Sequence, residues 1–155
     1  MDMKRYYLAY GSNLNMKQMK LRCPGARVMG TAYIHGYGLF FKGSKTGSYL
    51  TVEPKEGGIV PAGVWEVTGH DELALDRYEG FPEFYYKAEL PIRYTGIITG
   101  QEREAEAFIY IMHEEREIGM PSRFYVQTCA EGYRDFGFDE TYLAEAIEIS
   151  RKAVS

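Results

Sequence analysis

The sequence of 155 residues lacks any apolar run long enough to cross a membrane, and the apolar core of a secretory signal is missing from its first segment, Met1-Asp2-Met3-Lys4-Arg5. It also lacks an excess of basic residues, because 22 aspartates and glutamates outnumber 18 lysines and arginines and give a formal net charge of -4. Such a composition provides no basic surface for nucleic acid. We therefore expect neither nucleic acid nor a membrane as a partner.

Cysteine and histidine are too scarce to indicate redox or metal chemistry. The two cysteines, Cys23 and Cys129, lie far apart, and no His, Lys or second Cys stands at a spacing typical of a catalytic thiol. We expect both to be small buried residues of a protein in the reducing cytoplasm. The three histidines, His35, His70 and His113, have no metal-ligand spacing, so we predict no zinc site.

No internal repeat, low-complexity segment or block of like charge divides the chain. Hydrophobic residues make up 45% of it, which argues against disorder, and its length suits one domain with a sizeable core. The sequence therefore predicts a single domain over residues 1–155.

Most of the predicted regular structure is strand. Runs rich in aromatic and β-branched residues, separated by glycines, are typical of strands joined by tight turns. They cover residues 27–34, 37–41, 48–52 and 59–67. Two further runs, 85–94 and 105–112, alternate apolar and polar residues and predict a long hairpin around residues 96–100.

Two short helices are predicted in the first half of the chain. The first covers residues 15–21. The second covers residues 71–78, begins at a cap supplied by Thr68 or His70, and ends at Gly80.

Two more helices are predicted near the end of the chain. Pro121-Ser122 opens one that continues to about residue 131, with Ser122 as its N-cap, and Asp139 caps the last one. Strands followed by late helices indicate the α+β class. We predict a small mixed β-barrel with helices packed on its outside.

The most informative motif is Tyr10-Gly11-Ser12-Asn13-Leu14, which follows an apolar run at the end of the first predicted strand. Glycine adopts backbone angles that other residues avoid, and Ser and Asn side chains favour local turn hydrogen bonds. Successive N–H groups of such a turn can converge on one carboxylate or oxyanion. Taken alone, the motif leaves open an ordinary strand-ending turn.

Glu79 is the strongest candidate for acid–base chemistry. It follows Leu75 by one helical turn, so its carboxyl group leaves the helix on the same side as a core leucine. It also stands at a helix C-terminus, where the macrodipole is negative. Desolvation and the dipole both raise the pKa of a carboxyl group, which makes it a better proton acceptor near neutral pH. A glutamate that simply points into water is the alternative that the spacing leaves open.

Three motifs in a fixed order carry a resemblance to a known family. They are Tyr10-Gly11-Ser12-Asn13-Leu14, Leu75-Asp76-Arg77-Tyr78-Glu79-Gly80 and Pro121-Ser122-Arg123-Phe124-Tyr125. Together they resemble the γ-glutamylcyclotransferase superfamily, which includes the AIG2-like proteins. The resemblance spans nearly the whole chain and implies a small mixed β-barrel flanked by helices. It also implies an enzyme that converts a γ-glutamyl compound into 5-oxoproline and a released amine or amino acid, without metal or organic cofactor.

The resemblance further implies roles for individual residues. Glu79 matches the family's catalytic glutamate, which acts as general acid and base. The turn from Tyr10 to Leu14 matches the substrate-binding loop, which holds the substrate through backbone N–H groups. Tyr125 matches a tyrosine that lines the pocket, and Tyr85 matches another, with Tyr86 as the alternative for that place.

We therefore expect a cyclotransferase-type enzyme whose partner is a small γ-glutamyl amine, peptide or conjugate, in a protein that is a monomer or a homodimer. Two alternatives stay open at this point, because a shared fold does not guarantee a shared activity. One is a non-catalytic binding module of the same fold. The other is a cyclotransferase that acts on a carrier-protein-bound γ-glutamyl intermediate.

Overall fold

The computed structural model describes residues 3–44 and 46–155 of the chain. Met1 and Asp2, which belong to the N-terminal segment considered above, and Lys45 lie outside the described residues. The elements follow one another as β1 (Arg5–Ala9), the 3-10 turn η1 (Ser12–Leu14), α1 (Met16–Arg22), β2 (Arg27–Ser44), β3 (Gly47–Val67), α2 (Gly69–Glu79), β4 (Tyr85–Gly96), β5 (Glu102–Met112), β6 (Glu117–Ile118), α3 (Arg123–Phe136) and α4 (Thr141–Val154).

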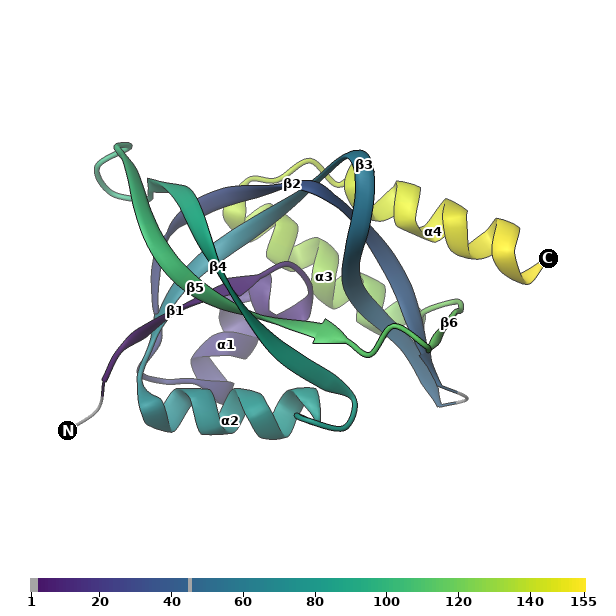
Figure 1. Cartoon of the computed structure of the whole chain (residues 1–155), viewed down its shortest axis with the longest axis horizontal. Helices are drawn as coiled ribbons and strands as arrows, with labels where there is room; N and C mark the ends of the chain where they lie inside the picture. The colour runs from purple at the N-terminus through teal and green to yellow at the C-terminus, as the bar shows by residue number, and fades with distance from the viewer. Residues whose placement is uncertain (1–2, 45) are drawn as a thin grey trace.

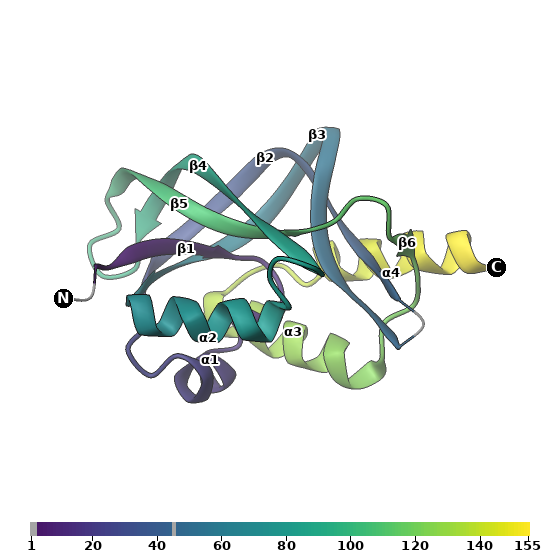
Figure 2. The ribbon, with the colours of Figure 1, turned by 60° about the horizontal axis from the view of Figure 1, so that its bottom comes forward.

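Five of the described strands close into a barrel (Figure 1). They follow the order β3, β1, β5, β4 and β2, and β2 pairs again with β3 to complete the ring. β1 and β5 are parallel, whereas the other neighbours are antiparallel. Figure 2 shows α1, α2 and α3 gathered on one side of this barrel. The predicted α+β class and the small mixed barrel with outer helices are confirmed.

The two longest strands differ from the prediction. The structure joins pairs of predicted strands into the continuous strands β2 and β3, namely 27–34 with 37–41 and 48–52 with 59–67. The pairing between β2 and β3 shifts register between His35 and Tyr37, where Gly36 has a φ of 82°. The extra residues lie on β3, where residues 55–58 stand opposite the single residue Gly36. This irregularity bends the two strands without ending them, because both flanks keep their partners. The predicted hairpin of 85–94 with 105–112 is confirmed by β4 and β5.

α2 begins two residues earlier and ends one residue later than predicted, and both of its caps are residues that the sequence offered. Thr68, and not His70, is the N-cap: its hydroxyl accepts from the N–H of Asp71 at 3.1 Å, and the Asp71 carboxylate accepts from the N–H of Thr68 at 3.2 Å. This reciprocal pair is a capping box. Gly80 ends the helix in the left-handed conformation, with a φ of 65°. The last residue of α2 is Glu79, so the end of the helix fixes where this side chain starts.

α3 is longer than predicted, because it passes through Gly132 and ends only at Phe136. Its start is as predicted, since the Ser122 side chain accepts from the N–H of Tyr125 at 3.1 Å. A glycine is needed at position 132 because α3 there packs directly against the turn after β1 and leaves no room for a side chain. A Cβ at this position would lie 2.6 Å from the backbone nitrogen of Asn15, closer than real contacts allow.

The last helix starts one residue later than its predicted cap suggests. Glu140 is the N-cap of α4 and makes no side-chain cap hydrogen bond. The Asp139 carboxylate nevertheless accepts from the N–H of Thr141 at 3.0 Å, so it satisfies one donor of the first turn.

The barrel is loosely closed between two of its strands. β2 pairs with β4 only through residues 30–32, and a cavity of about 510 Å³ follows the gap beyond this pairing. Ile34, Leu90 and Ile92 are among the residues that line it.

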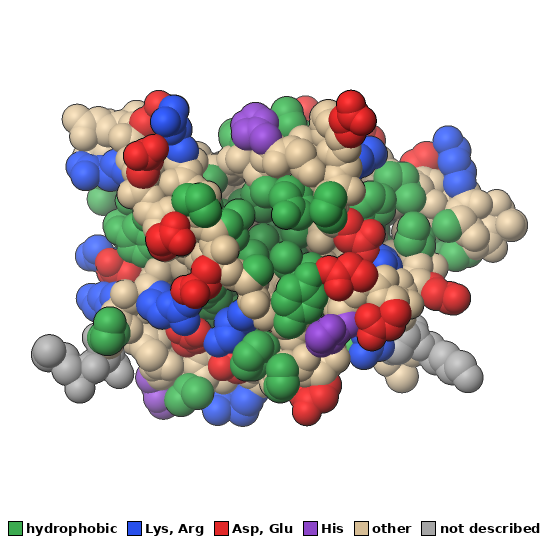
Figure 3. Space-filling model, viewed as in Figure 1, with side chains coloured by type: hydrophobic (Ala, Val, Ile, Leu, Met, Phe, Trp, Pro, Cys, Tyr) green, Lys and Arg blue, Asp and Glu red, His purple; other side chains and the backbone are tan. Residues whose placement is uncertain are grey.

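Figure 3 shows hydrophobic side chains at the centre of the face seen in Figure 1, with charged side chains around them.

Cys23 and Cys129 are both buried, as the sequence predicts, and neither is part of a disulfide. Burial raises the pKa of each thiol to about 12. Within the described part of the chain, none of the helices has the length and apolar character needed to cross a membrane, and His, Cys, Asp and Glu side chains form no group of three or more suited to a metal ion.

Replacing Gly132 should destabilise the fold, although alanine is the better helix former. In Gly132→Ala the new methyl group meets the backbone of Leu14 and Asn15, which cannot swing aside as a flexible side chain would. We expect the free energy of unfolding to fall by about 1–3 kcal/mol, the usual cost of overpacking. Urea unfolding followed by the fluorescence of Trp65, the only tryptophan, measures this change. A variant as stable as the parent would contradict the close packing of α3 on the turn.

Candidate active site

The turn after β1 presents unused backbone donors. A main-chain hydrogen bond of 3.0 Å from Leu14 to Gly11 closes it, and Trp65 Nε1 donates to the carbonyl of Asn13 at 3.0 Å. Within the described chain, no hydrogen bond uses the N–H groups of Gly11, Ser12 and Asn13. Consecutive N–H groups at the start of a turn form a binding place for an anion. The donors expected from the sequence are therefore available.

α2 is anchored to the barrel through acidic side chains on one of its faces. Glu72, Asp76 and Glu79 follow one another at helical spacing (i, i+4, i+7). The ammonium group of Lys87 on β4 lies 2.6 Å from the Glu72 carboxylate and 3.0 Å from that of Asp76. The hydroxyl of Tyr110 on β5 also donates to Asp76, at 2.6 Å. These contacts fix the helix that carries Glu79 at its last position.

Glu79 and the turn line two adjoining cavities that share four lining residues, a wide one of about 450 Å³ and a small one of about 20 Å³. We call them the outer part and the inner extension of one cavity. The residues that line both parts are Ser12, Glu79, Tyr85 and Tyr125. Gly11 and Asn13 line only the inner extension. A further contact joins the two elements, because the Ser12 hydroxyl lies 2.9 Å from the hydroxyl of Tyr78 on α2. The structure thus places the candidate acid beside the candidate anion site.

The surroundings of Glu79 disfavour its charged form. Burial raises the pKa of this carboxyl group to about 8, and the positive charge of Arg22 lowers it only in part. Within the described chain no hydrogen bond or ion pair reaches its oxygens. Glu79 therefore holds a proton at neutral pH and can exchange it there.

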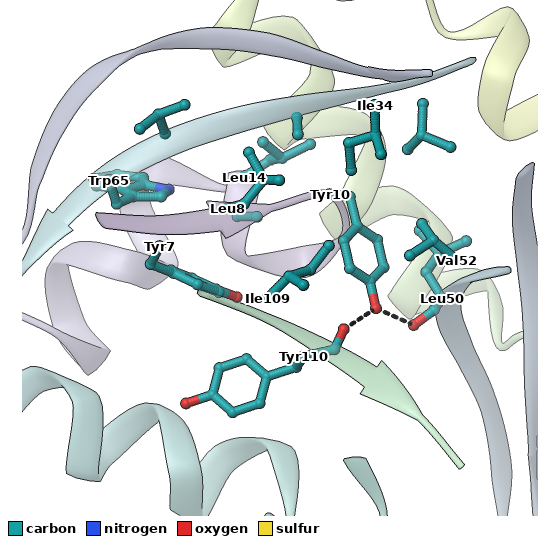
Figure 4. Close-up of a cluster of buried hydrophobic side chains, with 14 of the residues drawn as sticks. Tyr7, Leu8, Tyr10, Leu14, Ile34, Leu50, Val52, Trp65, Ile109 and Tyr110 are labelled. Carbon is teal, nitrogen blue, oxygen red and sulfur yellow. Dashed lines mark hydrogen bonds between the residues drawn. The ribbon is translucent and has the colours of Figure 1, made fainter. Parts of the chain in front are cut away.

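Tyrosine hydroxyls beside Glu79 are already committed to other acceptors. Tyr10 donates to the carbonyl of Tyr110 at 2.7 Å (Figure 4), and Tyr85 donates to the carbonyl of Leu50 at 2.7 Å. Burial, and to a lesser degree the charge of Glu79, raises the pKa of both phenols. Because each hydroxyl has a single hydrogen, neither can also donate to a Glu79 carboxylate.

Arg22, at the end of α1, is a site residue that the sequence did not indicate. Its guanidinium donates to Asn13 Oδ1 at 2.5 Å and to Gln18 Oε1 at 3.2 Å. The guanidinium carbon lies 3.4 Å from the centroid of the Tyr78 ring, a cation–π contact. α1 contains other basic residues, so only the packing of α1 beside α2 identifies the one whose charge acts on Glu79.

The two tyrosines left open by the sequence have different positions. Tyr85 lines both parts of the cavity, whereas the Tyr86 hydroxyl donates to the Glu114 carboxylate on the protein surface. Tyr125 lines the cavity as well, and its hydroxyl accepts from the N–H of Leu50 at 3.0 Å.

The residues of the predicted binding turn divide between the site and the core. Tyr10, Gly11, Ser12 and Asn13 line the inner extension. Leu14 is fully buried in the hydrophobic core and does not line the cavity. Its part in the motif is to anchor the turn.

The sequence matches one family model over residues 7–127, that of the gamma-glutamyl cyclotransferase, AIG2-like family. This match covers all three motifs on which the resemblance was based. A search of curated proteins gave no match.

Solved structures share the fold. A gamma-glutamyl cyclotransferase matches with a TM-score of 0.77 and 25% identity, over 93% of this chain and 86% of that one. An uncharacterized protein from Homo sapiens matches with a TM-score of 0.73 and 25% identity, over 92% and 86%. A yeast gamma-glutamyl cyclotransferase specific to glutathione matches with a TM-score of 0.65 at 13% identity, over 97% and 96%, which is a likeness of fold.

The raised pKa of Glu79 should make the stability of the fold depend on pH. Between its ordinary value of 4.5 and about 8, the folded state holds a proton that the unfolded state has lost. The free energy of unfolding therefore decreases as pH rises through this interval and levels off above it. Glu79→Gln removes the ionisation, so the variant should gain stability relative to the parent as pH rises. Urea unfolding of both proteins across this range measures the difference, and a difference independent of pH would contradict the burial of the carboxyl group.

Proposed function

Because the chain belongs to the gamma-glutamyl cyclotransferase, AIG2-like family, we propose that it converts a γ-glutamyl amine, peptide or conjugate into 5-oxoproline and a free amine. The observation that carries this proposal is the position of Glu79. Its carboxyl group, with a pKa of about 8, shares a cavity with the unused N–H groups of Gly11, Ser12 and Asn13. A γ-glutamyl substrate requires both features, an anion site for its α-carboxylate and a proton acceptor for its α-ammonium group.

In this proposal the turn orients the substrate. The N–H groups of Gly11, Ser12 and Asn13 bind the α-carboxylate in the inner extension of the cavity. The α-ammonium group, attached to the same carbon, then lies next to Glu79, which lines the inner and the outer part. The γ-carbonyl extends into the outer part. Holding both reacting groups of one molecule in a folded conformation removes much of the entropic barrier to ring closure.

Glu79 relays two protons, one after the other, between two nitrogens. Its carboxylate takes a proton from the α-ammonium group, and the freed amine attacks the γ-carbonyl carbon to form the C–N bond of the five-membered ring. The protonated Glu79 gives that proton to the leaving nitrogen as the original C–N bond breaks. The ring nitrogen then loses its second proton to the released amine through the same carboxylate, so one nitrogen gains the two protons that the other loses. One amide replaces another, so the reaction consumes no water and needs no oxidant or reductant. A pKa near the working pH suits a group that must accept a proton and release it again.

Glu79→Gln should lower kcat/KM for release of 5-oxoproline by about 10²- to 10⁴-fold, because glutamine keeps the size of the side chain but cannot carry the proton. The measurement is 5-oxoproline formed from a panel of γ-glutamyl compounds. Glu145→Gln, at an exposed position on α4, is the matched control and should keep its turnover.

Two outcomes of this assay count against the proposal in different ways. Turnover that survives Glu79→Gln unchanged removes this residue from the mechanism. A parent protein whose melting temperature rises with γ-glutamyl ligands, but which consumes none of the panel, is a binding module of the same fold.

The pH dependence of the parent provides a separate test. Only the ionised form of Glu79 accepts a proton, so kcat/KM should rise with pH and level off near its pKa of about 8. Initial rates at low substrate concentration across the neutral range measure this limb. Residual activity of Glu79→Gln should lack it, and a parent whose rate does not change over this range would be inconsistent with Glu79 as the base.

A further inference from the structure

Two arginines line the outer part of the cavity without an acidic partner. Arg77 stands on the last turn of α2, and Arg116 lies in the loop between β5 and β6. Within the described chain neither of them forms an ion pair, whereas Arg5 and Lys87 are both paired with Glu72 on α2. The two guanidinium groups are therefore charges that the protein itself leaves unneutralised.

Arg116 is held in place by an aromatic ring, a contact that does not neutralise its charge. Its guanidinium carbon lies 4.1 Å from the centroid of the Phe84 ring, and this cation–π contact restricts the plane of the group. Its Nε is buried and has no hydrogen-bond partner among the described residues. This atom therefore faces the protein, and the terminal nitrogens are the part of the Arg116 guanidinium that is left to meet a ligand in the cavity.

The net charge of the cavity favours an anion. Among the described residues that line it, Glu79 is the single acidic one, and with a pKa of about 8 it is mostly neutral at pH 7. The outer part then has two positive charges and no negative one to balance them.

The order in which binding groups line the cavity matches the order of the chemical groups in a γ-glutamyl substrate. Gly11 and Asn13 line the inner extension, Glu79 lines both parts, and Arg77 and Arg116 line the outer part. A γ-glutamyl substrate bound by its α-carboxylate at the turn has its scissile amide next to Glu79. Whatever is attached to the amide nitrogen then extends toward the arginines.

Building on the proposed function, we infer that Arg116, assisted by Arg77, binds a carboxylate on the leaving group. The preferred substrates are then γ-glutamyl amino acids or peptides, and not γ-glutamyl amines. The two terminal nitrogens of a guanidinium form two parallel donors, which match the two oxygens of a carboxylate. This assigns Arg116 as a specificity-determining residue, because it acts on the leaving group and not on the atoms that react.

Two substrates that differ only in this carboxylate test the inference. γ-Glutamylalanine and γ-glutamylethylamide have the same carbon skeleton up to the carboxyl group, and the ratio of their kcat/KM values measures its contribution. We expect the parent to prefer γ-glutamylalanine, and the ratio to fall about 10- to 100-fold in Arg116→Gln, the range for a hydrogen bond between charged groups. Arg77→Gln should lower it less, and Arg116→Lys, which keeps the charge without the paired donors, should retain part of it.

Arg151→Gln, at an exposed position on α4, is the matched control and should keep the ratio of the parent. A parent that processes both compounds equally, or an Arg116→Gln variant that keeps the preference, would overturn the inference. Failure of both compounds to yield 5-oxoproline would instead count against the cyclotransferase proposal. In that case the affinities of the two compounds, measured by calorimetry, test the role of Arg116. If the parent binds γ-glutamylalanine more tightly than γ-glutamylethylamide and Arg116→Gln loses this difference, the role is supported. Equal binding of the two compounds by the parent, or no binding, overturns it.

Discussion

The site depends on one constraint: the carboxyl group of Glu79 is buried in a cavity where two neighbouring hydroxyls, those of Tyr10 and Tyr85, already donate elsewhere. Tyr10 donates to the carbonyl of Tyr110, which ties the end of β1 to β5, and Tyr85 donates to the carbonyl of Leu50, which ties β4 to β3. Two hydrogen bonds that tie strands of the barrel together thus also keep these two hydroxyls from donating to the carboxylate. Its pKa is raised to about 8 as a result of burial, and this places the proton exchange near neutral pH.

Two separate elements have to meet for this cavity to exist. The turn after β1 is supported from below by α3, which approaches closely because Gly132 has no side chain. The end of α2 is set by the salt bridges of Lys87 and by the left-handed Gly80. The Ser12 and Tyr78 hydroxyls, 2.9 Å apart, join the two elements at the cavity. The acid and the anion site are therefore held by rigid neighbours, as a reacting geometry requires.

The fold and the proposed choice of substrate have different structural origins. Solved structures with 25% and 13% identity share this barrel, so its architecture tolerates extensive change in sequence. The inner extension offers backbone donors, which survive any substitution that preserves the turn. The outer part is built by side chains from the end of α2 and from the β5–β6 loop, among them Arg77 and Arg116. Under the function proposed above, discrimination between leaving groups is a property of these side chains and not of the fold.

Local patterns in the sequence were enough for the class of fold, the β4–β5 hairpin, the capping of α2 at Thr68, and the suspicion that Glu79 is buried. Each of these follows from short-range geometry: alternation, caps and helical spacing. The bend at Gly36 was misread as a turn, because whether a glycine ends a strand depends on the partner strand beside it. What the sequence determined by itself is therefore the set of elements and the residue types able to do the chemistry. Only the tertiary structure decided that Arg22 acts on Glu79, that Tyr85 and not Tyr86 faces the cavity, and that Arg116 forms no ion pair with any of the described residues. These relations join residues far apart in the chain and depend on how the helices pack against the barrel.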